Sequence, residues 1–116
     1  MAGNATGLFD SPLAQELRRE FDAELCRGAS AYQAGNSVLQ RHAEQLNDPE
    51  FGPIIFYALA ELQMEQGVID SKVRKRALTY INSGEGLEAW RGANAEIFDA
   101  RRNVEQELRM KLVGMG

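Results

Sequence analysis

The chain is poor in the residues on which most enzyme sites and extracellular folds depend. Its 116 residues include one cysteine, Cys26, and one histidine, His42. A single cysteine forms no intramolecular disulfide, which fits a reducing compartment. A zinc site usually needs several nitrogen or sulfur ligands, and one histidine with one distant cysteine does not supply them. The sequence therefore predicts no cofactor, no metal and no catalytic residue, with Cys26 as a small buried side chain.

Long apolar segments are also missing. The longest uninterrupted apolar run, Ile54 to Ala60, is far shorter than the ~20 residues that cross a bilayer. The segment from Met1 to Gly7 has neither the basic nor the apolar region of a signal peptide. We therefore expect a cytoplasmic protein without membrane contact. The net charge of −4 argues against nucleic acid as the partner.

Convincing strand alternation is absent, and the residues that begin and end segments are typical of helices. Ser11-Pro12 is a start signal, because the serine hydroxyl caps a free backbone N–H and proline at the first position loses no hydrogen bond. Gly28 supplies a left-handed stop. Apolar residues at helical spacing follow each start. We predict helices over about 12–27, 31–46, 53–66, 71–83 and 95–113, with a short helical turn at 87–91.

The third predicted helix is apolar on almost every side, which is typical of a buried central helix. A strand over 54–57 is the alternative, but the length of the segment and its alanine and leucine content favour a helix. Gly35 interrupts the second helix at a cost of about 1 kcal/mol relative to alanine. We expect Asn94 to cap the last helix and Gly114 to end it, and Glu105–Arg109 and Glu107–Lys111 to pair on its exposed face.

Short connections favour antiparallel neighbours and one domain. The fold class predicted is therefore all-α: an irregular bundle of about five helices over residues 1–116, with an N-terminal arm at 1–10. On this arm, Phe9 is expected to fold back as an apolar staple onto the first helix.

The order of several landmarks resembles a family of small bacterial proteins known only as a domain of unknown function, whose members open with a Gly-x-x-Gly-Ile-Phe-acidic arm. The landmarks are Gly7-Leu8-Phe9-Asp10, Asp48-Pro49, Gly52-Pro53, Ile69-Asp70, Arg76-Ala77-Leu78 and Leu87-x-x-Trp90. The resemblance covers about residues 3–110. It implies a bacterial or phage origin and a helical fold, and it carries over no catalytic residue. His42 departs from the pattern, because an aromatic residue of the tyrosine kind is expected there.

Acidic residues of the first helix have two interpretations, as metal ligands or as a solvated surface. Glu16 and Glu20 lie four residues apart and share a face of the first helix, a spacing that suits a divalent ion. No Glu-x-x-His motif elsewhere completes a carboxylate-bridged site, so the interpretation favoured here is an acidic surface in contact with water. Glu61 and Glu65 are expected to form the solvent-facing strip of the central helix.

A basic cluster opens the fourth helix: Lys72, Arg74, Lys75 and Arg76. Positive charge near a helix N-terminus is mildly unfavourable. The alternatives are a solvated face, an acidic protein surface as partner and nucleic acid. Trp90 and Tyr80 are candidates for an aromatic anchor at an interface, against the alternative of a tryptophan in the core.

Without catalytic groups, the sequence favours a non-enzymatic protein that binds another protein: an inhibitor, immunity protein or adaptor. Its candidate binding residues are Lys72, Arg74, Lys75, Arg76, Trp90 and Tyr80. Two alternatives stay open. One is a ligand-binding or enzymatic domain with a pocket near Glu61, Glu65, His42 and Tyr57. The other is a structural homo-oligomer.

Overall fold

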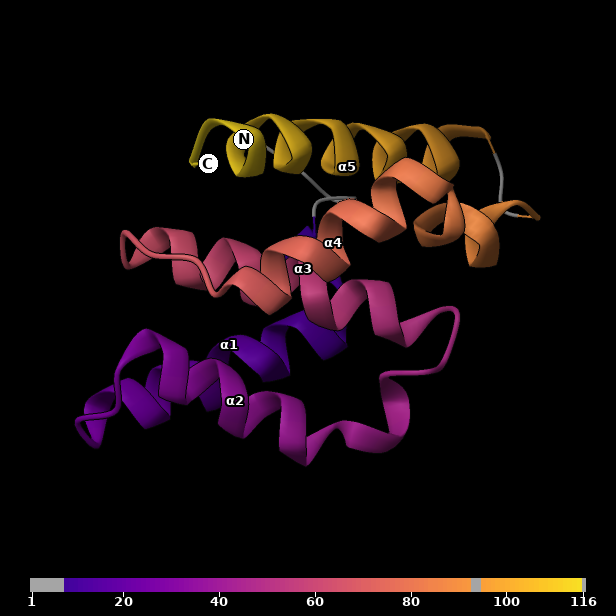
Figure 1. The fold of residues 1–116 in the computed structure, drawn as a ribbon. Coiled ribbons are helices and arrows are strands. Elements are labelled where there is room, and N and C mark those ends of the chain that lie inside the picture. Colours follow the sequence, from indigo (N-terminus) through magenta and orange to yellow (C-terminus); the bar gives the residue numbers. More distant parts are fainter. Residues whose placement is uncertain (1–7, 93–94, 116) are drawn as a thin grey trace.

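The computed structural model describes residues 8–92 and 95–115. This part of the chain contains no strand, which confirms the all-α prediction. It forms five α-helices, α1 (Pro12–Cys26), α2 (Ala31–Arg41), α3 (Phe51–Glu65), α4 (Ser71–Ser83) and α5 (Ala95–Met115) (Figure 1). Three short 3₁₀ segments accompany them, η1 (Leu8–Asp10), η2 (Ala43–Gln45) and η3 (Glu85–Trp90).

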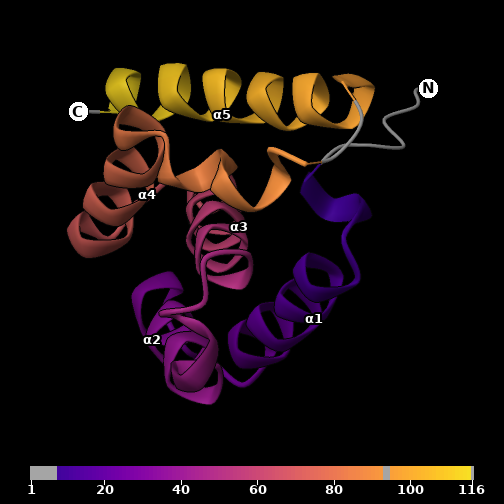
Figure 2. The ribbon, with the colours of Figure 1, turned by 90° about the vertical axis from the view of Figure 1, so that its right-hand side faces the viewer.

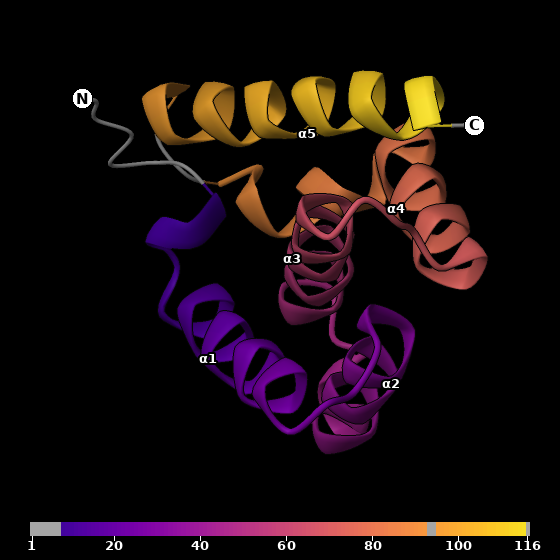
Figure 3. The same ribbon diagram turned by 90° about the vertical axis from the view of Figure 1, so that its left-hand side faces the viewer.

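Helix α3 is the centre of the bundle. In Figures 2 and 3 it lies between α5 on one side and the pair α1 and α2 on the other, with α4 beside it. Every residue from Gly52 to Ala60 is buried, so this helix contacts its neighbours all round. Its prediction as the buried central helix is confirmed, and the strand alternative is wrong.

Side-chain caps fix where three helices begin. The Ser11 hydroxyl accepts a hydrogen bond from the Ala14 backbone N–H, and Ser30 forms a reciprocal capping box with Gln33. The Asp70 carboxylate accepts from the Lys72 N–H at 2.8 Å and begins α4. This carboxylate also places negative charge at the helix N-terminus, which offsets part of the unfavourable position of the basic cluster.

Gly35 lies inside α2 for a packing reason. A Cβ at this position would overlap the side-chain amide of Gln63, which is fully buried on α3. The Gln63 amide nitrogen donates to the Ala31 carbonyl at 3.2 Å, and its oxygen accepts from the Asp70 N–H at 3.0 Å. One buried side chain therefore joins α3 to the beginnings of α2 and α4.

Several predicted boundaries were wrong. Helix α2 ends at Arg41 instead of residue 46, and the chain continues as η2. Helix α3 begins at Phe51 instead of residue 53. The Asp48 carboxylate accepts hydrogen bonds from the backbone N–H groups of Glu50 and Phe51 at this start. Helix α5 continues through Gly114 to Met115. The predicted cap Asn94 lies outside the described residues.

The N-terminal segment uses Leu8 as its anchor. Leu8 is buried in η1, whereas Phe9 is half-buried and lies under the guanidinium of Arg18, 4.5 Å from the ring centroid. Both residues pack against the core. The expected staple is therefore supplied by two neighbouring residues instead of Phe9 alone.

Two residues differ from prediction in their solvent exposure. Cys26, expected to be buried, is exposed at the end of α1. Glu105, expected on the exposed face of α5, is 4% exposed and accepts a hydrogen bond from the Tyr57 hydroxyl at 2.5 Å. The predicted pair of Glu107 and Lys111 is also replaced by another, since Lys111 forms an ion pair with Glu61 of α3 at 3.1 Å.

None of the helices in the described ranges combines the length and the apolar character that a bilayer crossing demands.

Candidate functional site

The four cations of the basic cluster occupy different environments on α4. Lys72 and Lys75 are exposed and have no hydrogen bond or ion pair through their side chains in the described part of the chain. Arg74 is half-buried, and its Nε donates to the Leu112 carbonyl at 3.1 Å. That carbonyl belongs to the last turn of α5, where backbone oxygens lack helical partners. Arg74 therefore ties α4 to α5 and leaves the two lysines facing solvent.

Arg76 is held by aromatic rings. Its guanidinium carbon lies 5.0 Å from the centroid of Phe56 and 5.2 Å from that of Tyr80. One guanidinium nitrogen also donates to the Tyr80 hydroxyl at 2.7 Å. Cation–π contacts of this kind fix the plane of the guanidinium while leaving other N–H groups able to donate. No carboxylate among the described residues pairs with Arg76.

A cleft of about 500 Å³ opens in front of Arg76. One wall is the turn before α3, another is α4, and the third is η3. The lining residues are Leu46, Asn47, Asp48, Pro49, Arg76, Thr79, Tyr80, Glu85 and Glu88. The structure thus brings two predicted residues, Arg76 and Tyr80, into one cleft. The turn at 46–49 was not predicted as a wall, because only tertiary packing places it there.

A second, more open depression of about 680 Å³ follows one face of α4. Its lining includes Arg74, Lys75 and Leu78. Four of the predicted residues therefore line two neighbouring hollows, and Lys72 lies one turn away on the same helix. Trp90 belongs to η3, but its side chain lies outside the described residues.

Six cations elsewhere in the described ranges have carboxylate partners, whereas Arg19 and Arg109 have none. Arg18 binds Glu65 through two hydrogen bonds, and Arg27 and Arg41 share Glu24. Arg91, Arg102 and Lys111 also form ion pairs. The basic cluster of α4 differs from these six, since none of its four members has a carboxylate partner in the described ranges.

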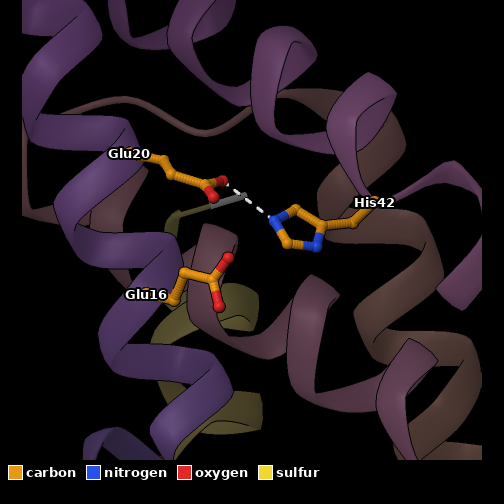
Figure 4. Close-up of side chains that lie close together, drawn as sticks. All are labelled: Glu16, Glu20 and His42. Atoms are coloured by element: carbon orange, nitrogen blue, oxygen red, sulfur yellow. Dashed lines mark hydrogen bonds and ion pairs between the residues drawn. The ribbon is translucent and has the colours of Figure 1, made fainter.

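A second group of polar side chains joins α1 to the end of α2. Glu16 and Glu20 point from α1 toward His42, the residue after α2 (Figure 4). His42 Nε2 lies 2.9 Å from a Glu20 oxygen, and Nδ1 lies 2.7 Å from the side-chain oxygen of Gln45. Burial lowers the pKa of His42, but the hydrogen bonds to Gln45 and Glu20 and the nearby carboxylates outweigh burial and raise it above its ordinary value.

The residues suggested for an enzymatic pocket have separate partners. Glu61 pairs with Lys111 of α5, and Glu65 pairs with Arg18 of α1. His42 instead contacts Glu20. As predicted, Glu61 and Glu65 provide the polar side of α3, and their pairing with neighbouring helices explains their positions.

Tyr57 lies one turn before Glu61 on α3, against Glu105 of α5. Burial and the contact with Glu105 raise the pKa of the Tyr57 hydroxyl, and burial also raises the pKa of the Glu105 carboxyl. Gly86 packs directly on this pair, since a Cβ there would overlap both polar groups. The Tyr57–Glu105 pair therefore joins α3 to α5, and η3 covers it.

No protein-family model, curated protein or solved structure matches the chain. The resemblance to the small bacterial family therefore stays a prediction.

Proposed function

We propose that this protein binds an acidic segment of another protein through α4 and the cleft in front of Arg76. One observation carries the proposal: the chain is acidic overall, yet four cations gather on α4 without a described carboxylate partner. Such a surface attracts negative charge and accelerates association with a partner of opposite sign.

Arg76 supplies the specific part of the interface. Because two rings and the Tyr80 hydroxyl already orient its guanidinium, little side-chain entropy is lost when a ligand binds. A guanidinium offers a fork that suits a carboxylate. Lys72 and Lys75 provide the longer-range attraction, and a cleft of about 500 Å³ accommodates a few side chains of the partner.

A protein partner suits this surface better than nucleic acid. Nucleic-acid surfaces usually combine positive charge with aromatic rings that stack on bases. Tyr80 is half-buried and bonded to Arg76, so its ring is not free for stacking.

Binding without catalysis is consistent with an inhibitor, immunity protein or adaptor of bacterial or phage origin that acts in the cytoplasm. The sequence resemblance supports the origin, and the single cysteine, which fits a reducing compartment, supports the location.

A second candidate is self-association through the end of α5. Met110 is 76% exposed and Val113 is 59% exposed, three residues apart on one helical face. Sedimentation at rising protein concentration tests this candidate. A monomer at all concentrations would exclude it, and a dimer abolished by Met110→Glu would support it.

Charge reversal on α4 tests the main proposal. Lys72→Glu with Lys75→Glu changes the charge of the surface by −4 and breaks no described side-chain hydrogen bond or ion pair. Arg19→Glu with Arg109→Glu is the matched control on other helices, with the same change in net charge and likewise no described side-chain hydrogen bond or ion pair to break. Partners captured from the source cell are compared for the two variants.

We expect the α4 variant to lose a specific partner that the control retains. The captured partner should also bind more weakly at high salt, because screening weakens exposed charges. Retention of every partner by the α4 variant, or equal loss from both variants, would refute the proposed interface.

A further inference from the structure

The cluster of Glu16, Glu20 and His42 has the composition of a metal site. One potential ligand atom from each side chain lies within 4.8 Å of the other two. Two carboxylates come from successive turns of α1, and the imidazole comes from the end of α2 (Figure 4). Two oxygen ligands and one nitrogen ligand therefore converge from two different elements.

The spacing of the two closest atoms suits a shared ion. His42 Nε2 and the Glu20 oxygen are 2.9 Å apart. Ligands at tetrahedral positions around Zn²⁺, each at about 2.1 Å from it, lie about 3.4 Å from one another. An ion can therefore replace the proton between these two atoms if their separation widens by about 0.5 Å.

Gln45 holds the imidazole in the orientation that such a site needs. With a proton on His42 Nδ1, that nitrogen donates to the Gln45 oxygen at 2.7 Å. Nε2 of the neutral ring is then unprotonated and faces the carboxylates. Metal-binding histidines commonly use their second ring nitrogen in this way, which fixes both the tautomer and the ring plane.

The two acidic ligands differ in how firmly they are held. The His42 and Glu20 side chains are 10% and 19% exposed. Glu16 is exposed and has no hydrogen bond or ion pair in the described ranges. It can therefore move toward an ion without breaking a contact. Arg18 lies between the two acids in sequence, but it is turned away to Glu65.

We infer that Glu16, Glu20 and His42 bind a divalent first-row transition-metal ion, with water completing its coordination. The mixed nitrogen and oxygen ligands favour Zn²⁺ or Co²⁺ over Mg²⁺ and Ca²⁺, which prefer oxygen alone. The ion would link α1 to the end of α2. This inference is independent of the interface proposed on α4.

Titration with Zn²⁺ tests the inference in the full chain carrying Cys26→Ser, which removes the exposed thiol as a competing ligand. Calorimetry should give one Zn²⁺ per chain at pH 7.5, and Co²⁺ should give a visible absorption band. Affinity should fall as the pH drops from 8 to 6, because a proton then competes for His42. Mg²⁺ at equal concentration should not displace Zn²⁺.

Three variants locate the site. Glu16→Gln and His42→Gln should each weaken Zn²⁺ binding by about tenfold or more, the range found when a metal site loses a supporting group. Asp22→Asn is the matched control, since it removes an exposed carboxylate from the same helix. Glu16→Gln should leave the melting temperature without metal unchanged, so its effect reports binding instead of folding.

The inference is overturned if the Cys26→Ser protein binds no Zn²⁺ at pH 7.5. Zn²⁺ binding that is equally strong in the Glu16→Gln, His42→Gln and Asp22→Asn variants would overturn it as well, because the ion would then lie elsewhere.

Discussion

Helices α1 and α4 both begin at a side-chain cap and both bury an apolar stripe against α3. Their charged faces are used differently. On α1, Arg18, Glu20 and Glu24 each contact a side chain from another helix or its end. On α4, Lys72 and Lys75 form no hydrogen bond or ion pair with a described side chain. Charged side chains that link helices already have partners within the molecule, whereas unpaired charged side chains can bind another protein.

The largest expected effect tests what the two helices share. Phe21→Ala on α1 removes a ring that is 1% exposed and should lower the free energy of unfolding by about 3–5 kcal/mol. Val73→Ala on α4 should cost about 2 kcal/mol, because a smaller buried group is lost. Urea unfolding measures both values. A negligible effect of either change would show that the helix does not pack on α3 as described.

A smaller effect on the α1 side depends on pH. Because the pKa of His42 is raised above 6.5 in the folded state, the folded protein holds this proton more tightly than the unfolded chain does. The resulting stabilisation is complete below pH 6.5 and is lost as the pH rises through the higher folded pKa. Urea unfolding between pH 6 and 9, with a chelator present, should show this loss. His42→Gln should abolish it, and an identical pH profile in that variant would contradict the assignment.

The shared ion pair of Glu24 should have a more modest effect. Glu24 contacts Arg41 at 2.8 Å and Arg27 at 3.0 Å, and its side chain is 15% exposed. Glu24→Gln should lower the free energy of unfolding by about 0.5–1 kcal/mol, the upper part of the range for surface pairs. The difference should shrink in high salt. Glu44→Gln, at an exposed carboxylate without a described partner, should cost less and serves as the control.

The smallest expected effect tests the difference between the charged faces of α1 and α4 directly. Lys72→Glu with Lys75→Glu should change the free energy of unfolding by less than about 0.5 kcal/mol, since exposed residues without contacts seldom affect stability. Thermal and urea unfolding measure this value. A loss above about 1 kcal/mol would show that the lysines support the fold, and α4 would then resemble α1.

Helix positions were predictable because their signals are local. Ser11, Ser30 and Asp70 cap the helices whose starts they mark in the sequence. Contacts between helices were not predictable. The spacing of Glu105 and Arg109 is typical of an exposed pair, but the rotation of α5 on the core turns Glu105 inward to Tyr57.

The same limit applies to the candidate sites. The sequence shows Glu16 and Glu20 on one helical face, but His42 joins them only because the end of α2 packs against α1 at that point. The basic cluster was visible from its composition alone. The rings of Phe56 and Tyr80 that hold Arg76 come from two helices, so no local pattern indicates them.

The buried pair of Tyr57 and Glu105 also bears on the order in which the protein folds. These residues are separated by 48 positions, and α5 leaves the ribosome after the other four helices described. Helices α1, α2 and α3 are consecutive and can pack while the rest of the chain is still being made. Until α5 arrives, the Tyr57 hydroxyl lacks its Glu105 partner, and the apolar surface covered by Leu108 and Leu112 stays exposed. Docking of α5 is therefore the step that closes the core, and a nascent chain halted before it is the form most prone to aggregate.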